Sequence, residues 1–311
     1  MRVPCIIEGN AVGSARRRTL AANDSWSDGG AVRSRLFFTI FHGVPDENEP
    51  EAALAGSEFH GGRRAVGRTP NQVVRRCRLR ILIASDLHAN LEAVRSLPSD
   101  YDQLWILGDI VNYGPDPLEV IEFVREHASL VVRGNHDDAV GFDRDPQCSP
   151  SFRRLAEETA AFTKSVVSGQ EREFLRGLPL TAGRDIDGIR FFVCHAAPGN
   201  PLHEYRTADS EMWAKDAAQK FCDVLLAGHT HVPFCRKVGA RLVANPGSVG
   251  QSKHEGGRAC YAIWENRDLR LESVAYPIEK TVAKLRNLPV SPEVRDQLEA
   301  VLRTGSLLTV K

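Results

Sequence analysis

Five short apolar runs of strand character each end directly in a polar block, and this repeated pairing constrains the fold more than any other feature. In chain order the blocks are Asp86-Leu87-His88, Gly108-Asp109, Gly134-Asn135-His136-Asp137, His195 and Gly228-His229-Thr230-His231. Runs of this kind are typical of buried strands. Polar side chains just past the ends of such strands lie where an α/β fold builds its active site.

Each block alone has an ordinary explanation. Asp86-Leu87-His88 matches a short pattern that arises often by chance. Gly134-Asn135-His136-Asp137 is typical of a turn, because Gly and Asn tolerate left-handed backbone. Five such blocks at strand ends, taken together, favour a metal site. Carboxylate and amide oxygens mixed with imidazole nitrogens suit divalent metals, and pairs of such metals catalyse hydrolysis.

The set of blocks resembles the calcineurin-like metallophosphoesterase superfamily, from about Arg80 to about Tyr276. It is most similar to a small bacterial and archaeal phosphodiesterase-like branch with the segment Gly-Asp-x-Val-Asn-Tyr-Gly-Pro-Asp-Pro, here Gly108 through Pro117. The run from Asn245 to Gln251 is similar to the same branch. The resemblance implies an α/β fold in which two facing mixed β-sheets are flanked by helices, a four-layer sandwich.

The resemblance also implies two divalent metal ions and a set of ligands. The first ion is expected on Asp86, His88 and His231, the second on Asn135, His195 and His229, with Asp109 between them. His136 is the expected catalytic proton donor and is not expected to be a ligand. Mixed nitrogen and oxygen ligands admit several metals, of which we expect Mn²⁺, with Fe, Zn²⁺, Ni²⁺ and Mg²⁺ as alternatives.

The ligand types predict the chemistry. Two divalent ions roughly 3.5–4 Å apart lower the pKa of a shared water, and the resulting hydroxide attacks phosphorus in line. His136 would protonate the departing alkoxide. Neutral Asn135 supplies an oxygen without adding a charge that repels phosphate. The predicted function is a binuclear phosphoesterase, a phosphoric ester hydrolase, acting on phosphomonoesters or phosphodiesters of small molecules or nucleotides. The sequence does not choose between monoesters and diesters.

Four further residues are candidates for substrate contacts. Asn112 and Tyr113 stand where the protein Ser/Thr phosphatases of this superfamily have Asp and Arg, which argues against protein-phosphatase activity because Tyr lacks the two-pronged guanidinium. Gln251 and Arg258 flank a Gly-rich loop, residues 252–257. This loop either closes over the site or is an ordinary hairpin loop, and its composition fits both interpretations.

Composition limits the alternative functions. Lys plus Arg and Asp plus Glu both number 40, and this neutral charge balance argues against a nuclease of this superfamily, which needs a basic channel for a polyanion. A non-catalytic metal-binding scaffold of the same fold remains a second alternative, disfavoured because the ligand set is complete. Seven irregularly spaced cysteines and no apolar run of ~20 residues predict a cytoplasmic protein without a membrane partner. The oligomeric state stays open.

The first 78 residues differ from the rest. They are rich in Gly, Ser and Arg, contain no Lys and show no sustained periodicity, so we expect an N-terminal extension of low order. A regulatory arm is one alternative. Another is that the segment is not part of the native protein and that translation starts near Leu79. Residues 79–311 are the predicted metallophosphoesterase domain, C-terminal helices included.

Strand and helix patterns alternate after Arg80, which indicates a mixed α/β domain. Strands are expected at 80–85, 103–107, 130–132, 180–182, 189–194, 223–227, 241–244, 260–264 and 269–274. Helices are expected at 90–97, 118–127, 151–168, 208–221 and 278–303. In the helix over 151–168, the residues expected to point inward are Leu155, Ala161, Phe162 and Val166.

Overall fold

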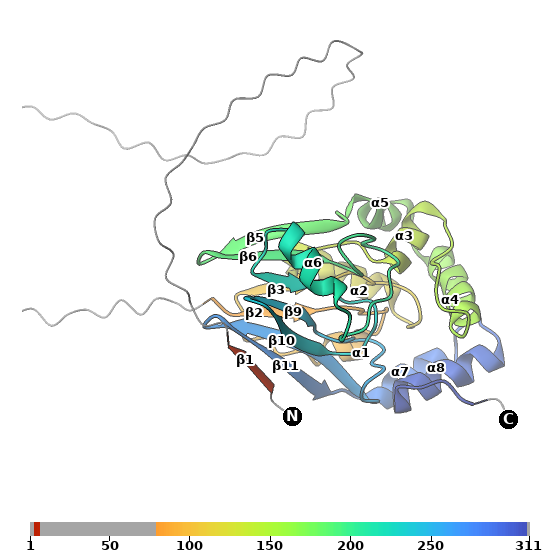
Figure 1. Ribbon diagram of the computed structural model, residues 1–311. Helices are drawn as coiled ribbons and strands as arrows, with labels where there is room; N and C mark the ends of the chain where they lie inside the picture. Colours follow the sequence, from red (N-terminus) through yellow and green to blue (C-terminus); the bar gives the residue numbers. More distant parts are fainter. Residues whose placement is uncertain (1–2, 7–78, 310–311) are drawn as a thin grey trace, which may run out of the picture. The chain divides into compact units, whose positions relative to one another are not determined.

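Two β-sheets face each other in the protein (Figure 1). The computed structural model describes residues 3–6 and 79–309. The first sheet has the order β1-β11-β10-β2-β3-β4. Its strands are β1 (Val3–Ile6), β2 (Ile81–Ala84), β3 (Gln103–Ile106), β4 (Leu130–Val131), β10 (Arg258–Glu265) and β11 (Asp268–Ala275). Strands β2, β3 and β4 run parallel, and β10 pairs antiparallel with β2.

The second sheet has the order β5-β6-β7-β9-β8. Its strands are β5 (Thr181–Ile186), β6 (Ile189–Cys194), β7 (Val224–Leu226), β8 (Phe234–Val238) and β9 (Arg241–Asn245). The three central strands β6, β7 and β9 are parallel, and β5 and β8 pair antiparallel at the edges. Both sheets are therefore mixed, with parallel strands where the polar blocks follow.

An apolar core fills the space between the sheets. Ile81, Ile83 and Trp105 of the first sheet pack with Phe191 and Val224 of the second. Successive side chains of a strand point to opposite faces, so each strand supplies this core with every second residue. Fully burying side chains of this size stabilises the fold by about 1.5–3 kcal/mol each. This core keeps the carboxyl ends of both sets of parallel strands at a fixed distance.

Helices cover the outer faces of both sheets. Leu82 and Leu104 pack against α1 (Leu91–Val94) and α2 (Pro117–His127) on the first sheet. Trp213 of α6 (Met212–Gln219) packs on Leu225 of the second sheet. The remaining helices are α3 (Asn135–Phe142), α4 (Arg153–Val166), α5 (Gly169–Gly177), α7 (Ile278–Leu285) and α8 (Pro292–Thr304). The predicted fold class is confirmed.

The predicted C-terminal helix is wrong as a single element, because the structure has two helices, α7 and α8. Pro289 follows α7 by four residues, and its ring would clash with the carbonyl of Leu285 if the helix continued. Pro292 then occupies the first helical position of α8, where its missing N–H costs nothing. Helices α4, α7 and α8 pack on one another at one end of the sheets (Figure 1).

The inward face predicted for α4 is partly wrong. Leu155 is buried as expected, but Ala161 is exposed and Val166 is 38% exposed. Thr159 and Thr163 are buried in their place. The Thr159 hydroxyl donates a hydrogen bond of 2.6 Å to the carbonyl of Leu155, which removes most of the cost of burying it. Helices α3 and α5 and strand β8 are further elements that the periodicity did not predict.

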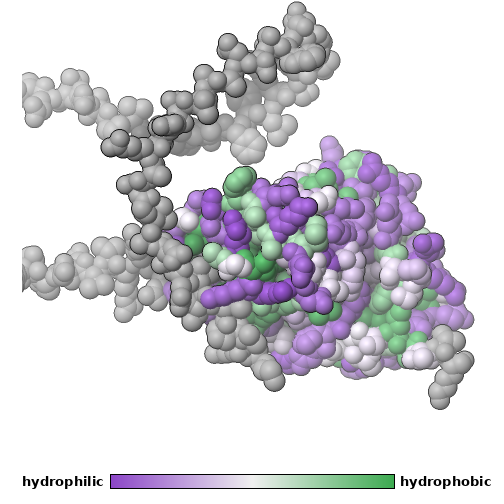
Figure 2. All heavy atoms as spheres, in the orientation of Figure 1, coloured by the Kyte–Doolittle hydropathy of each residue, from purple (hydrophilic) through white to green (hydrophobic). Residues whose placement is uncertain are grey.

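Most of the predicted N-terminal extension lies outside the described residues. Within it the structure describes only β1, which pairs antiparallel with β11. The proposed boundary at residue 78 and the proposed start near Leu79 therefore stay predictions. In the described part of the chain, no helix is both long and apolar enough to cross a membrane. Figure 2 shows hydrophilic residues over most of one face, with hydrophobic residues in smaller areas between them.

Candidate active site

The strand ends bring the predicted ligands to one place. Two blocks follow β2 and β3, one follows β4, and two follow β6 and β7 of the facing sheet. Their side chains form one cluster, here called the ligand wall, of which Asp109, Asn135, His229 and His231 line a cavity. It consists of Asp86, His88, Asp109, Asn135, His195, His229 and His231.

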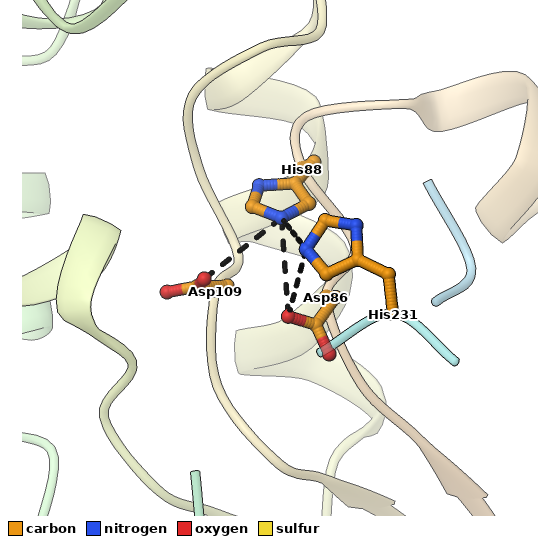
Figure 3. Close-up of side chains that lie close together, drawn as sticks. All are labelled: Asp86, His88, Asp109 and His231. Carbon is orange, nitrogen blue, oxygen red and sulfur yellow. Dashed lines mark hydrogen bonds and ion pairs between the residues drawn. The ribbon is translucent and has the colours of Figure 1, made fainter. Parts of the chain in front are cut away.

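The first group on the ligand wall contains Asp86, His88, Asp109 and His231 (Figure 3). The Nε2 atoms of His88 and His231 lie 3.0 Å apart. The His231 Nε2 is 3.3 Å from Asp86 Oδ1, and the His88 Nε2 is 3.8 Å from Asp109 Oδ2. All four side chains are buried, so this is a closed cluster of two carboxylates and two imidazoles.

The second group shares Asp109 with the first and adds His195, His229 and Asn135. The Nε2 atom of His195 lies 3.2 Å from Asp109 Oδ2, 3.1 Å from Asn135 Oδ1 and 3.2 Å from the Nδ1 atom of His229. The Asn135 amide nitrogen donates to the carbonyl of Pro146 at 2.7 Å, which directs the amide oxygen to the ligand wall. Asp109 is the residue common to both groups.

The hydrogen bonds behind these rings fix which nitrogen carries the proton. The Nδ1 atoms of His88 and His231 lie 3.1 Å and 2.7 Å from the backbone carbonyls of Val111 and Gln251. A carbonyl only accepts, so each Nδ1 is protonated and each Nε2 presents a lone pair. The two facing Nε2 atoms therefore cannot bond to each other. Asp86 Oδ1 beside them is buried and has no hydrogen-bond partner in the described part of the chain.

The same logic applies to the second group. His195 Nδ1 donates to the carbonyl of Leu107 at 2.7 Å, so Nε2 is the ring atom that faces the oxygens of Asp109 and Asn135. Buried acceptors gathered without donors are unfavourable unless a cation lies among them. Carboxylate, amide and imidazole donors match the preferences of divalent first-row metals. The residues present therefore fit metal ions.

Burial affects the titration of these groups. It lowers the ring pKa of three ligand-wall histidines, namely His88, His231 and His229, the last to about 3. Neutral imidazole is the form that binds metals. Burial also acts to lower the pKa of His195, but the Asp109 carboxylate outweighs it and raises this pKa to about 9. Burial opposes ionisation of Asp109, yet His195 and His136 hold its pKa well below the usual range.

The backbone of the ligand wall is left-handed at many positions. The residues with positive φ include Asp86, His88, Asp109, His229 and His231, with values between 45° and 67°. This region is sparsely populated by side-chain-bearing residues, although Asp, Asn and His tolerate it better than most. Backbone hydrogen bonds hold the strained segments, for example Asp86 N to Gly108 O and His88 N to Asp109 O, both 3.0 Å. The sharp turns aim consecutive polar side chains into the cavity.

Two glycines of the polar blocks are needed because atoms of neighbouring loops lie very close to their Cα atoms. A Cβ on Gly134 would lie 2.1 Å from Asp109 Oδ1, and one on Gly228 would lie 1.9 Å from Ser85 Oγ. Neither position leaves room for a side chain. The glycines that precede Asn135 and His229 therefore allow the ligand loops to pack against each other.

Asp137 holds two of these loops together. Its carboxylate accepts hydrogen bonds from the backbone N–H groups of Asp109 and Gly134 at 2.9 Å and of Ile110 at 2.8 Å. Burial and the nearby Asp109 raise its pKa to about 7. Asp137 therefore both orients backbone and caps the following helix, since Gly134 is the N-cap of α3.

His136 lies beside the ligand wall and lines the cavity. Its Nδ1 atom is 2.9 Å from the Nδ2 atom of Asn112, and its Nε2 atom is 3.6 Å from the Sγ atom of Cys148. Burial lowers its pKa. Tyr113 also lines the cavity, with its ring 4.8 Å from that of His136 and its hydroxyl donating to Cys148 Sγ at 3.6 Å. Asn112 therefore orients the imidazole.

The two other candidates for substrate contacts are placed differently. The side chain of Gln251 is buried and does not line this cavity, while its backbone carbonyl supports His231. Arg258 does not reach the cavity either. Its guanidinium donates to the hydroxyl and carbonyl of Ser273 at 2.9 and 2.8 Å and pairs with Glu255 at 3.3 Å. Contacts with Ser273 and Glu255 therefore hold the Arg258 guanidinium, and it does not line the cavity.

The cavity in front of the ligand wall has a volume of about 230 Å³. A second set of lining residues, here called the loop wall, was not predicted from the sequence. The loop wall consists of Cys148, Phe152, His203, Tyr205 and Lys253. None of these residues follows a strand directly, so the pattern that identified the ligands carried no signal for them. Only Lys253 had a sequence indication, since it lies in the Gly-rich loop 252–257.

Comparisons with known proteins agree with this geometry. A family model described as the calcineurin-like phosphoesterase superfamily domain matches residues 79–268. An uncharacterized protein of Methanocaldococcus jannaschii is 31% identical over 228 residues, which cover 66% of this chain and 91% of that protein. The phosphodiesterase YfcE of Escherichia coli strain K12 is 27% identical over 206 residues, 60% of this chain and 88% of YfcE.

Solved structures include one with the same arrangement. The crystal structure of a metallophosphoesterase from Sphaerobacter thermophilus aligns with a TM-score of 0.61 and 30% identity, covering 71% of this chain and 98% of that one. The chain belongs to the calcineurin-like phosphoesterase superfamily. The predicted family and the predicted enzyme class, phosphoric ester hydrolase, are confirmed.

Proposed function

We propose that the protein is a binuclear metal-dependent phosphoesterase that acts on small phosphorylated molecules. One observation carries the proposal: carboxylate, amide and imidazole groups converge on two adjoining points, and among the described residues Asp86 Oδ1 is buried there without a hydrogen-bond partner. Such an arrangement is stabilised by cations. Asp86, His88 and His231 would hold one ion, and Asn135, His195 and His229 a second, with Asp109 contacting both.

The chain's own residues divide the remaining work. Divalent ions, when bound, neutralise charge on phosphoryl oxygens and activate water for hydrolysis. Asp109 would serve both points, since its Oδ2 lies 3.8 Å from His88 Nε2 and 3.2 Å from His195 Nε2 while its Oδ1 accepts from the His136 N–H. Asn135 contributes a neutral oxygen and so leaves the site attractive to an anion. The carbonyls behind the histidines keep the rings in the tautomer that presents a lone pair.

His136 is placed to move a proton at the leaving oxygen. Its ring lines the cavity next to Asp109 but belongs to neither ligand group. Asn112 contacts Nδ1, so Nε2 is the atom that faces the cavity and the Cys148 thiol. A positioned imidazole of this kind contributes typically 10²–10⁴-fold to a reaction that expels an alkoxide. No Ser or Cys nucleophile is required.

Small phosphoesters are the substrate class that the site supports best, nucleotides among them. The cavity of about 230 Å³ suits a phosphoryl group with a modest organic part. The similarity to a protein named as a phosphodiesterase supports the reaction class. Mn²⁺ is the metal we would test first, followed by Fe, Zn²⁺, Ni²⁺ and Mg²⁺, because mixed nitrogen and oxygen donors admit all of them. The cytoplasmic location stays a prediction.

The test combines metal content with turnover. The purified full chain is stripped with a chelator, reloaded with each metal in turn, and analysed by elemental analysis. Hydrolysis of p-nitrophenyl phosphate and bis-p-nitrophenyl phosphate is then followed. We expect about two ions per chain, loss of activity on chelation and recovery on reloading. Turnover that chelation leaves unchanged, or a protein that takes up no metal, would contradict the proposal.

A further inference from the structure

Lys253 brings an ammonium group to the loop wall. It is partly buried, and its Nζ atom lies 4.4 Å from the centre of the Phe152 ring. Such a cation–π contact stabilises a charge by about 0.5–2 kcal/mol, which offsets only part of the hydration free energy that the ammonium loses on burial. Burial lowers the pKa of this lysine, and Asp86, Cys148 and Asp109 act to raise it. The side chain lines the same cavity as Asp109, His229 and His231, and the Lys253 backbone N–H donates to the carbonyl of His231 at 3.4 Å.

The ammonium has no carboxylate partner in the described part of the chain. Lys164 and Lys284, by contrast, form ion pairs with Asp143 and with Glu92 and Asp116. Lys253 is also the only Lys or Arg among the described residues that line the cavity. A partly buried cation is retained without a partner at a cost in stability, because its desolvation is not offset by an ion pair.

The loop that carries Lys253 is firmly anchored. The Ser252 hydroxyl accepts hydrogen bonds from the N–H groups of His254 and Glu255, at 3.3 and 3.1 Å. Gly257 N donates to the carbonyl of Leu302 in α8 at 2.7 Å. A Cβ on Gly256 would lie 2.1 Å from the carbonyl oxygen of Arg303, so glycine is needed for this contact. Loop 252–257 is therefore fixed on α8, which sets the position of the ammonium.

We propose that Lys253 binds a non-bridging phosphoryl oxygen of the substrate, so that the cavity favours phosphomonoester dianions over phosphodiester monoanions. The inference rests on the proposed function. Two divalent ions on the ligand wall carry more charge than Asp86 and Asp109 neutralise. The ammonium that lines the same cavity then gains a partner only when an anion occupies that cavity. Coulomb attraction to that anion doubles with its charge.

The experiment measures anion binding separately from turnover. Lys253→Gln, Lys253→Arg and the wild type are loaded with Mn²⁺, and binding of inorganic phosphate is measured by titration calorimetry. The control is Lys237→Gln, an exposed lysine on β8 that changes the net charge equally. A charge-assisted hydrogen bond predicts about 10- to 100-fold weaker phosphate binding for Lys253→Gln. Lys253→Arg should stay within about threefold of wild type, and the control should be unchanged.

Kinetics supply the specificity readout. For Lys253→Gln, kcat/KM for p-nitrophenyl phosphate should fall by about the same 10- to 100-fold, and that for bis-p-nitrophenyl phosphate by clearly less. Metal content should equal that of wild type. Unchanged phosphate affinity, equal losses on both esters, or loss of metal in the variant would overturn the inference. If wild type binds Mn²⁺ and phosphate but hydrolyses neither ester, the proposed function fails. The calorimetry then still tests whether Lys253 binds the phosphoryl group.

Discussion

The two walls of the cavity are built in different ways. Residues of the ligand wall follow strand ends, and their backbone is held by hydrogen bonds between loops, such as Asp86 N to Gly108 O. Residues of the loop wall come from loops and from Phe152, the N-cap of α4, and packing or ion pairs hold them. Arg206, for instance, is buried over the ring of Trp213 and pairs with Asp216, and it fixes the segment that carries His203 and Tyr205.

This difference suggests that one wall carries out the hydrolysis and the other selects the substrate. The ligand wall concentrates acceptors at a fixed geometry, and a change there should affect metal binding and turnover together. The loop wall presents Lys253, an exposed tyrosine and other groups that vary in chemistry, and a change there should affect which ester is preferred. Functional residues on loops over a rigid scaffold commonly divide in this manner. The predictions below test whether the walls can be changed independently.

The largest effect is expected for Asp109→Asn. The substitution keeps the shape of the side chain and an oxygen that can accept from His136 N, now 2.9 Å from Oδ1. It removes the charge shared by the two ligand groups. We expect kcat/KM to fall by about 10⁴-fold, ~5 kcal/mol, with loss of at least one ion. Elemental analysis and steady-state kinetics measure both. A variant with full metal content and wild-type turnover would contradict the role of this residue.

His136→Ala should give the next largest effect. The ring lies outside both ligand groups, so metal content should match that of wild type. Loss of the proton donor predicts a fall in kcat of about 10²- to 10³-fold for esters with alkoxide leaving groups, and a smaller fall for p-nitrophenyl phosphate, whose leaving group is stable as an anion. The comparison of the two leaving groups is the measurement. Equal losses on both would contradict the role of His136 as proton donor.

Much of the fold could be predicted from the sequence because strand patterns are local. Each of the five apolar runs forms a strand, and the block after it reaches the ligand wall. The ligand set is readable for the same reason: parallel strands put their carboxyl ends at one edge, so residues far apart in sequence meet there. His88 and His231 are 143 residues apart and lie 3.0 Å from each other.

The remaining features depend on partners that local patterns do not contain. Thr159 and Thr163 look polar, yet Thr159 is buried because a helix carbonyl accepts its hydrogen bond. Arg258 was a candidate substrate contact, yet its guanidinium is held by Ser273 and Glu255 instead. The place of Lys253 beside the ligand wall depends on the contact of its loop with α8, which the sequence does not show. Long side chains can reach in several directions, and tertiary contacts choose among them.

Gly134→Ala tests how tightly the ligand loops are packed. The new Cβ would lie 2.1 Å from Asp109 Oδ1 and 2.3 Å from its backbone nitrogen, so the loops must separate. We expect the free energy of unfolding to fall by about 1–3 kcal/mol, with weaker metal binding. Gly177→Ala is the matched control, since nothing lies within 4 Å of its Cβ. Denaturant unfolding and metal titration should leave the control unchanged. A stable Gly134→Ala protein with normal metal affinity would show that the ligand loops tolerate separation.

Tyr205→Ala should give the smallest effect and addresses the loop wall alone. The side chain is 59% exposed at the cavity, with its ring 6.0 Å from that of His229. An aromatic ring in this place can stack on the organic part of a substrate, a contact of about 1 kcal/mol or more. We expect KM for a nucleotide ester to rise about fivefold and that for glycerol phosphate to stay constant, while Tyr205→Phe behaves as wild type. If metal content and all substrates change together, the two walls are one unit, because selection could then not be altered without disturbing the ions.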